Sequence, residues 1–535
     1  MDALIAVGSK QAPTGDQQRR LVDDVISRSL VAPGERATTT TLGRWTIVAI
    51  DSHTKPYCDQ WVTQDDRLVI ACRGYTTSDE QPPVAFSRLV ADPQRWRRHR
   101  RREFRLTESP GGIYAAVVVD LRLDRLHAWS SHGNVESLYY CETASTWVVG
   151  TDPLAVHVVA ASDHRVRFDA AWARHVMLTG SSLEHDTPYP DTMRIPSRRA
   201  IRIADDGVTL QPHPVEISIT PRHASIDELE DAVVRAVRPC GSHADPVLRL
   251  SGGKDSRAAL AAIVAAHGDV RAVTMGAEGS GEVEVARQVA RSVGIPHEMI
   301  ERDTISSDEI WNTIADNVRA ASGLLSENRN LIFPLPRPGV HAVEVHGQAH
   351  HLRGGFMSRD RYDEAAVSAA MTQRFGSGHS FCSDELMSEA ERLTAAYLRR
   401  SDIGRSGLQL YWAYGDLRIA AWLSAGFAKL RRNALLIWPF LDERVLDVTA
   451  RLPVRLRTEE TAQYELIARA TPDAARLPLF DSVWRFDRRG HGAKVYPDWA
   501  GERTERVTDG VIRRTRRAPV GSTTDLVALA RDAMS

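Results

Sequence analysis

The chain has 535 residues, a formal net charge of −1, 43% hydrophobic residues and 26% charged residues. This composition is ordinary for a globular protein of several domains, and it provides no global positive field for nucleic acid. The N-terminus lacks a basic segment followed by a long apolar core, and no apolar run reaches the roughly 18 residues of a membrane span. The five cysteines are too widely spaced for a zinc or disulfide framework. We therefore expect a cytoplasmic protein with neither nucleic-acid nor membrane partners.

Residues 1–215 have the pattern of a β-rich domain. β-branched and aromatic residues dominate several short segments that turn residues separate. These segments are 45–50, 67–72, 113–121, 126–130, 137–140 and 147–150. Their spacing predicts stacked antiparallel sheets with few helices. A basic cluster at 95–105 predicts either contact with an acidic partner or a solvated charged face.

Two parts of this region resemble the amidotransferase half of asparagine synthetase-type proteins. The first runs from GGIYAA (111–116) through LYY (138–140) to VVGTDPL (148–154), and the second is the segment 192–200. The resemblance implies a glutaminase-like, Ntn-type antiparallel sandwich over 1–215. Its glutaminase activity requires a cysteine at position 1 after removal of Met, whereas this chain begins Met1-Asp2-Ala3. Because a carboxylate cannot replace a thiol nucleophile, we expect a scaffold without glutaminase activity.

After a polar linker at 211–225, the pattern changes to alternating helices and strands. Helices are predicted over 227–237, from 255 to about 266 and over 282–293, with an N-cap at Ser225 or Asp227. Strands are predicted over 247–250, 270–275 and 297–300. This order predicts a doubly wound parallel sheet that binds its ligand at the carboxyl ends of the strands. We assign a synthetase domain to 225–505 and a peripheral tail to 506–535.

The segment SGGKDS (251–256) joins the first of these strands to a helix. Its glycines allow the backbone to approach a ligand, and the free N–H groups of the helix start attract an anion. Its two hydroxyl groups and its lysine add donors and positive charge. Asp255 would repel phosphate unless a cation lies between them, which predicts Mg²⁺ on Asp255.

SGGKDS does not fit a Walker A loop. It resembles the pyrophosphate loop, SGGxDS, of the ATP pyrophosphatase superfamily. Members of that superfamily cleave ATP between the α and β phosphates and adenylate a substrate. The resemblance implies a sheet of the adenine nucleotide alpha hydrolase type, in which the backbone of Thr274 and Met275 would face the adenine.

The segment VEVHGQAHHLRGGF (343–356) resembles SGEGSDEVFGGY of the same family. His350 and His351 stand where that family has an acidic pair, one member of which commonly helps to hold Mg²⁺. Histidine is a poor ligand for this hard ion, so Asp255 and the phosphate oxygens would have to hold it. Three alternatives remain: a transition-metal site that includes His346, a contact to the ATP phosphates, and a polar loop wall.

Later segments supply further candidates. WPFLDERVLD (438–447) and LP (452–453) resemble a family segment that is mostly packing. Asp416, in the helical segment 411–430, is a candidate acid or base, although a surface salt bridge with Arg418 is the alternative. The superfamily places a lysine further on for the acyl-transfer step, which makes Arg489 and Lys494 candidates; solvated charges are the alternative.

The resemblance assigns these residues to two groups. The predicted catalytic residues are Asp255, Asp416, Arg489 and Lys494, with Asp255 also the metal ligand. The predicted ATP- and pyrophosphate-binding residues are Ser251, Gly252, Gly253, Lys254, Ser256, Thr274, Met275, Gly347, His350 and His351.

The implied reaction is ATP-dependent amide formation that releases AMP and pyrophosphate, with ATP and Mg²⁺ as cofactors. Two families combine a nucleophile-less front domain with this synthetase domain: β-lactam synthetases and lasso-peptide (macrolactam) cyclases. SGGKDSR, HGxxxxLRGG and LPLFDSVW (477–484) resemble the cyclases, which join the N-terminal amine of a precursor peptide to an Asp or Glu side chain. That resemblance implies three partners: the precursor peptide, a leader-peptide-binding protein and a leader protease. The alternatives are a β-lactam synthetase-like or asparagine synthetase-like small-molecule amide synthetase, or a degenerate module that binds nucleotide or peptide.

Overall fold

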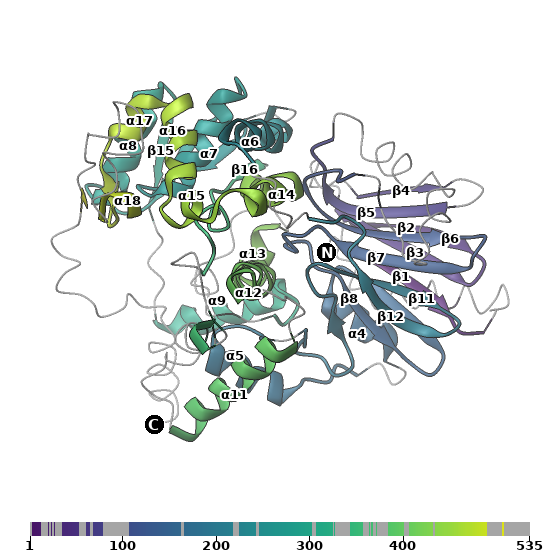
Figure 1. Ribbon diagram of the computed structural model, residues 1–535. Helices are drawn as coiled ribbons and strands as arrows, with labels where there is room; N and C mark the ends of the chain where they lie inside the picture. The colour runs from purple at the N-terminus through teal and green to yellow at the C-terminus, as the bar shows by residue number, and fades with distance from the viewer. Residues whose placement is uncertain are drawn as a thin grey trace.

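The computed structural model describes most of the chain, with gaps. The described residues are 3–11, 20, 23, 26, 35–52, 60–64, 68–78, 106, 108–161, 165–183, 185–217, 224–241, 245–301, 307–324, 326, 343–356, 363, 365–367, 371, 384–400, 406–431, 434–488 and 506–507. We refer to the residues up to 217 as the front half and to those from 224 as the back half. The β-rich front half and the helix-rich back half lie side by side (Figure 1).

Within the described residues, the front half contains two six-stranded antiparallel sheets. The first has the order β10-β8-β9-β1-β3-β2 and the second β12-β11-β7-β6-β5-β4. The first sheet comprises β1 (Ala3–Ser9), β2 (Glu35–Leu42), β3 (Trp45–Ser52), β8 (Tyr139–Glu142), β9 (Thr146–Gly150) and β10 (Met193–Arg194). The second comprises β4 (Gln60–Gln64), β5 (Leu68–Tyr75), β6 (Ile113–Asp120), β7 (Arg125–Ser130), β11 (Arg199–Ala204) and β12 (Gly207–Pro212). The prediction of antiparallel sheets is confirmed.

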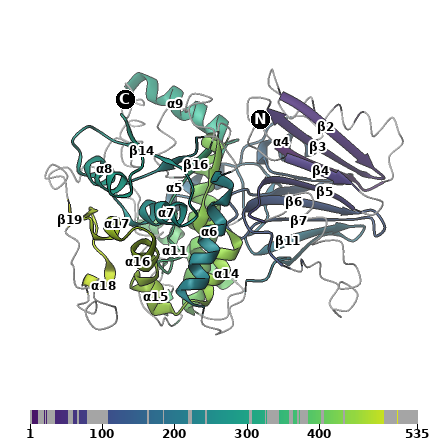
Figure 2. The same ribbon diagram turned by 90° about the horizontal axis from the view of Figure 1, so that it is seen from above.

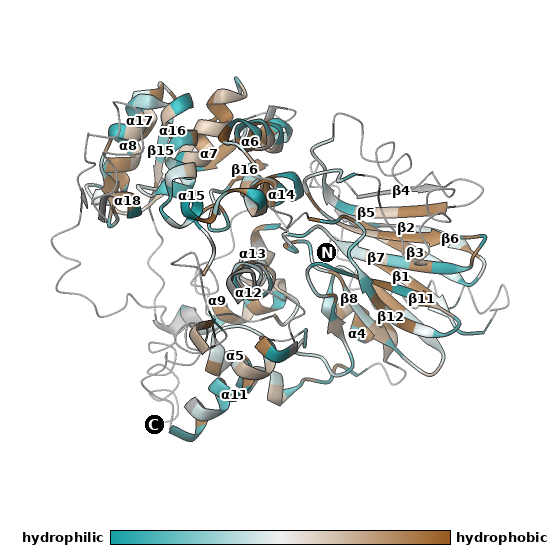
Figure 3. Ribbon diagram, viewed as in Figure 1, coloured by the Kyte–Doolittle hydropathy of each residue, from teal (hydrophilic) through white to brown (hydrophobic). Residues whose placement is uncertain are grey.

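The two sheets pack face to face as a sandwich. Leu4 and Ile47 of the first sheet share a buried cluster with Val117 and Leu126 of the second. All residues of β6 are buried, because its opposite face, with Tyr114, belongs to a separate cluster. Hydrophobic residues accordingly follow β3 and β6 in Figure 3. Helix α4 (Pro153–Ala160) packs against β8 and β9, whereas α5 (Ala170–Thr179) packs against α11 (Asp384–Arg400) of the back half.

The back half is built on a parallel sheet of order β15-β14-β13-β16-β17. Its strands are β13 (Val247–Arg249), β14 (Arg271–Met275), β15 (His297–Ile300), β16 (Val343–Val345) and β17 (Leu435–Ile437). The chain proceeds from β13 to one side of the sheet and then returns to the other. Because parallel crossovers are right-handed, this reversal places helices on both faces, as in a doubly wound sheet. The predicted parallel sheet is confirmed.

The helices of the back half follow the predicted order, with bounds shifted by a few residues. The first four are α6 (Ile226–Gly241), α7 (Lys254–Ala265), α8 (Gly281–Val293) and α9 (Ser307–Ala320). Before β17 come α11 (Asp384–Arg400), α12 (Ser406–Ala413), the π-helix η2 (Tyr414–Leu423) and α13 (Ser424–Arg431). After β17 come the 3₁₀ turn η3 (Pro439–Leu441), α14 (Glu443–Arg451), α15 (Val454–Thr458), α16 (Thr461–Ala470), α17 (Pro472–Arg476) and α18 (Arg485–Arg488).

The predicted boundaries 211–225 and 506 need adjustment. The last strand of the front half continues to Pro212, so the linker starts later than its composition indicated. At the other end, β19 (Arg506–Val507) pairs in parallel with β18 (Leu479–Phe480). The start of the predicted tail therefore lies against the back half, and the rest of the tail lies outside the described residues.

The two halves share a buried boundary, and α14 lies at it in both views (Figures 1 and 2). Tyr75, Ile113 and Val135 of the front half belong to the same hydrophobic cluster as Trp438 and Phe440. The front half is thus part of the core on which the parallel sheet rests. Within the described residues, no helix combines the length and the apolarity needed to cross a lipid bilayer.

Candidate active site

The candidate site lies where the strand order of the parallel sheet reverses. The chain leaves β13 toward β14 on one side, and β16 lies on the other side. At such a switch point the loops that follow the two strands diverge and leave a crevice at the carboxyl edge of the sheet. A cavity of about 350 Å³ lies between these loops. It is lined by Arg249, Ser251, Gly253, Lys254, Asp255, Ser256, His346, Gly347, Gln348, Arg353 and Ser482.

The glycines of the loop have different roles. A Cβ on Gly252 would lie 2.5 Å from Cβ of Phe480, so this glycine is required for packing rather than for ligand approach. A Cβ on Gly253 would meet only Ser251 Oγ, at 3.3 Å, and Gly253 lines the cavity. A Cβ on Gly347 would lie 2.3 Å from the backbone of Asp255. Gly347 therefore allows the two loops to touch, while Gly253 keeps the cavity open.

The two serines of the loop brace it internally. Their Oγ atoms lie 2.9 Å apart, and Ser256 Oγ accepts a hydrogen bond from the N–H of Ser251 at 3.0 Å. Ser251 Oγ accepts a second bond from the N–H of Gly253 at 3.2 Å. These bonds fix the turn that presents the start of α7 to the cavity. The unpaired N–H groups of a helix start favour an anion there.

Lys254 contributes positive charge to the cavity wall from a fixed position. Its Nζ donates to the carboxylate of Glu460 and to the carbonyl oxygen of Val483, the latter at 2.7 Å. Burial lowers the pKa of Lys254, and Glu460 opposes this effect. The ammonium group is therefore held in place by a buried carboxylate 206 residues away in the sequence.

Asp255 is enclosed by partners that favour its ionised form. Its Oδ2 accepts from Arg353 Nη2 at 3.0 Å, and its Oδ1 accepts from Gln463 Nε2 at 2.9 Å. Burial alone would raise the pKa of Asp255, but Arg353 and the bond from Gln463 outweigh it and hold the pKa below its usual range. Asp255 is thus a carboxylate that is already neutralised by a guanidinium.

This arrangement does not fit a protein-held Mg²⁺. That ion takes a nearly octahedral set of oxygen ligands, usually including one or two carboxylates. Both oxygens of Asp255 already accept hydrogen bonds, and the charged group beside them is a guanidinium. The described residues therefore do not support the predicted metal role of Asp255, and no step below is assigned to the ion.

The three histidines of the second loop have different surroundings. His346 Nε2 lies 3.3 Å from Glu344, and its ring lies against Trp438. His350 stacks on Tyr414, and its Nδ1 lies 3.3 Å from Asp255. His351 is 2% exposed and packs against the rings of Tyr411 and Tyr414.

These surroundings contradict the alternative of a transition-metal site formed by the histidines of this loop. Burial lowers the pKa of His350 and of His351 to about 3, with further lowering by neighbouring arginines, so both rings are neutral. His350 and His351 are also not among the residues that line the cavity. Among the described residues, the histidines of this loop do not form a group with metal-ligand spacing.

The other predicted residues lie in several places. Thr274 donates through Oγ1 to the carbonyl oxygen of Leu250 at 2.9 Å, and Met275 is 38% exposed at the end of β14. Arg489 and Lys494 lie outside the described residues. The role of each as a binding or catalytic residue stays a prediction.

Asp416 lies at the boundary with the front half and not in the cavity. Its Oδ2 accepts from Tyr397 at 3.1 Å and lies 3.5 Å from Arg198 Nη2 of the front half. Asp416 is 7% exposed, and the guanidinium of Arg418 instead lies over the ring of Trp422. The alternative of a surface salt bridge with Arg418 is therefore wrong.

Three charged residues of the site were not among the predicted ones. Arg249 on β13 pairs with Glu344 on β16 through bonds of 2.8 and 2.6 Å, while its Nη1 faces no hydrogen-bond partner. Arg353 also lines the cavity, and the buried Glu460 lies behind it, within ion-pair distance of Arg353 and Lys254. Glu344 and Arg353 fall inside the quoted segment 343–356, so their charge was a usable signal. Glu460 carried none, because only the fold brings it to Lys254.

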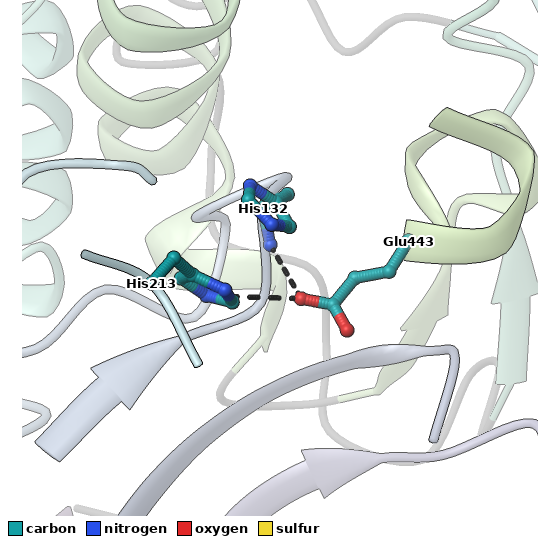
Figure 4. Close-up of side chains that lie close together, drawn as sticks. All are labelled: His132, His213 and Glu443. Carbon is teal, nitrogen blue, oxygen red and sulfur yellow. Dashed lines mark hydrogen bonds and ion pairs between the residues drawn. The ribbon is translucent and has the colours of Figure 1, made fainter. Parts of the chain in front are cut away.

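A second buried polar cluster joins the two halves (Figure 4). His132 and His213 of the front half point toward Glu443 at the start of α14, and the three have metal-ligand spacing. However, Glu443 already accepts bonds from Ser109 Oγ at 2.8 Å, Tyr114 OH at 2.9 Å and the N–H of His132 at 3.0 Å. Because both carboxylate oxygens of Glu443 already accept hydrogen bonds, this cluster is a hydrogen-bonded junction rather than a metal centre.

Comparison with known proteins gives one informative match. Residues 227–330 match the family model for asparagine synthase. The matched segment contains β13, the SGGKDS loop and α7, but not the loop after β16 or Glu460. No curated protein matches the chain.

Solved structures also match the chain, and the following two are among them. Glutamine phosphoribosylpyrophosphate amidotransferase from B. subtilis, complexed with ADP and GMP, is 11% identical, with 76% of this chain and 94% of that chain covered and a TM-score of 0.25. A structure described as the allosteric regulatory enzyme of purine biosynthesis is 12% identical, with 76% and 93% covered and a TM-score of 0.25. Likeness at this level carries no argument about fold or activity.

Among these comparisons, only the family match bears on the general class of activity. It covers the strand, loop and helix that form one wall of the cavity. It supports an ATP-dependent amide-forming synthetase in general terms, and it supports placing the chain in the asparagine synthetase-like superfamily.

Proposed function

We propose that the protein is an ATP-dependent macrolactam synthetase that adenylates a side-chain carboxylate of a peptide and closes a ring with the peptide's N-terminal amine. The observation that carries this proposal is the cavity at the switch point of the sheet. It combines the SGGKDS loop and the start of α7 with the cationic side chains of Arg249 and Lys254. This combination suits the phosphates of a nucleotide.

The proposed reaction has two steps. A peptide carboxylate oxygen attacks the α-phosphorus of ATP, the bond between the α-phosphorus and the bridging oxygen breaks, and pyrophosphate leaves with the electron pair. The amine then attacks the acyl carbon, AMP leaves, and the amine proton passes to solvent. The residues of the cavity serve the first step, because fixed positive charge stabilises the departing pyrophosphate without reorganisation.

The lasso-cyclase-like segments quoted above favour a peptide substrate over a small molecule. The leader-binding protein, the leader protease, AMP release and cytoplasmic location belong to this proposal as well.

The test is ATP–pyrophosphate exchange with synthetic peptides that carry a free N-terminus and one Asp or Glu at varied positions. We expect exchange with some of these peptides and a product lighter by one water. N-terminal acetylation of the same peptides should preserve exchange and abolish ring closure, whereas the Asn or Gln versions should lose both. Ring closure that releases ADP, or no exchange with any carboxylate, would overturn the proposal.

Variants separate catalysis from mere binding. Ser256→Ala removes the hydroxyl that braces the loop, and Lys254→Met removes the ammonium group of the cavity wall. Both should reduce exchange by at least about 100-fold, the range typical of lost transition-state electrostatics. Ser292→Ala on α8, whose hydroxyl bonds only to the carbonyl oxygen of Val289 among the described contacts, is the matched control. A module that binds nucleotide without turnover would show no exchange even in the wild type.

A further inference from the structure

The guanidinium of Arg353, which lines the cavity, lies between the carboxylates of Asp255 and Glu460. Its Nη2 donates to Asp255 Oδ2 at 3.0 Å, and its Nη1 lies 3.7 Å from Glu460 Oε1. The side chains of Asp255 and Glu460 are 17% and 1% exposed. Two acids so placed repel each other unless a cation stands between them, and here the cation is part of the protein.

The remaining contacts fix both acids in this position. Gln463 donates to the other oxygen of Asp255 at 2.9 Å. Glu460 receives Lys254 and the backbone N–H of Arg485, the latter at 3.0 Å. The two carboxylates are thus oriented toward one shared cation by bonds on their outer sides.

The backbone conformation of Glu460 also helps to hold its carboxylate toward Arg353. It has a φ of 67°, a left-handed conformation that is uncommon for residues other than glycine and costs free energy. This conformation lets a buried carboxylate at the start of α16 reach Arg353, Lys254 and Arg485 together.

We propose that Arg353 takes the place of a protein-held divalent cation between Asp255 and Glu460. In this arrangement the guanidinium is the permanent counter-charge of the two acids, and the protein without nucleotide does not bind a divalent ion there. The proposal concerns the free protein, so it does not depend on the reaction proposed above.

The test is titration of the full-length, nucleotide-free protein with Mn²⁺, followed by the electron paramagnetic resonance signal of the free ion. Mn²⁺ serves as the probe because it prefers the same oxygen ligands as Mg²⁺. Binding at this position is defined as the part that Asp255→Asn removes, which excludes weak surface sites. We expect Asp255→Asn, introduced alone, to leave the Mn²⁺ binding of the protein unchanged.

Removal of the guanidinium should create the metal site. Arg353→Met removes the one cation that Asp255 and Glu460 share, while Lys254 and Arg485 stay on the far side of Glu460. We therefore expect Mn²⁺ affinity to rise by at least about tenfold over the wild type. Adding either Asp255→Asn or Glu460→Gln should cancel the gain. Arg353→Lys is the matched control, because it keeps a cation between the acids and should bind no more Mn²⁺ than the wild type.

Two results would overturn the proposal. One is Mn²⁺ binding by the wild type that Asp255→Asn abolishes. The other is a folded Arg353→Met variant, judged by its circular dichroism, that gains no binding. Since the wild-type measurement needs no substitution at Arg353, the proposal can be tested even if that variant does not fold.

Discussion

At the residue scale, the approach of the two loops depends on Gly347. A Cβ there would lie 2.3 Å from the carbonyl of Asp255 and 2.4 Å from the nitrogen of Ser256. We expect Gly347→Ala to lower the free energy of unfolding by about 1–3 kcal/mol, because backbone atoms must move apart. ATP affinity, measured by calorimetry, should fall at the same time.

Gly253→Ala is the control for this prediction. Its φ of −93° is open to alanine, and the added Cβ faces the cavity. We expect a change in stability below about 1 kcal/mol, with weaker ATP binding. If Gly347→Ala is as stable as Gly253→Ala in urea denaturation, the two loops do not touch as described.

Glu443 predicts a pH dependence of stability. Burial raises its pKa from 4.5 to about 7, so the folded protein keeps a proton that the unfolded chain releases. This contribution is fully present below pH 4.5 and is lost as the pH rises through 7. From the shift, the loss is about 3 kcal/mol.

Urea denaturation of the wild type and of Glu443→Gln at several pH values isolates the contribution of Glu443 protonation to the free energy of unfolding. Gln cannot ionise, while the hydroxyls of Ser109 and Tyr114 can reorient toward its amide. We expect the wild type to lose about 3 kcal/mol relative to the variant between pH 4.5 and pH 8. A difference that stays constant, or that grows in favour of the wild type, would contradict the assigned pKa.

The residue scale also shows what sequence reasoning could find. The SGGKDS loop was identifiable because its residues are contiguous and lie between a strand and a helix. Glu460 was not, because it reaches Lys254 only through the packing of α16 against α7. The sequence placed Asp255 on a metal, but the charge that meets it comes from Arg353, 98 residues away.

At the element scale, α6 begins with a reciprocal cap. The N–H of Glu228 donates to Ser225 Oγ at 3.1 Å, and the N–H of Ser225 donates to Glu228 Oε1 at 3.2 Å. We expect Ser225→Ala to lower the free energy of unfolding by about 1 kcal/mol. Ser225→Asp retains an acceptor and should cost less, so an equal loss for both in urea denaturation would contradict the cap.

Element prediction succeeded where periodicity was strong. The helices at 226–241, 254–265 and 281–293 lie within a few residues of their predicted bounds. The strand β1 is not among the predicted strands, although its pairing with β3 and β9 makes it central to the first sheet. The π-helical stretch η2 has no sequence signal, because it depends on packing.

At the scale of the whole molecule, the two halves should unfold together. Asp442 accepts a bond from Thr77 Oγ1 at 2.6 Å, and Trp438 N–H donates to Tyr75 OH at 3.1 Å, both across the boundary. These contacts are buried and continuous with the largest hydrophobic cluster. We expect a single calorimetric transition, and two well-separated transitions would show that the boundary contributes little.

The architecture of the molecule was largely predictable, whereas the boundary between its halves was not. Short segments rich in β-branched and aromatic residues, separated by turn residues, indicated the sandwich, and the βαβα order indicated the parallel sheet. The segment 438–447 was interpreted as packing, yet Asp442 and Glu443 within it bond to the front half. Contacts of this kind depend on the relative placement of two domains, which local patterns do not encode.

The central claim is that a peptide carboxylate is activated as an acyl-adenylate at the cavity beside Ser251–Ser256. The most direct measurement labels the side-chain carboxylate of a reactive peptide with ¹⁸O and follows the label by mass spectrometry. An acyl-adenylate predicts that one ¹⁸O appears in AMP. Recovery of the lost ¹⁸O in inorganic phosphate or in water, with none in AMP, would contradict the claim.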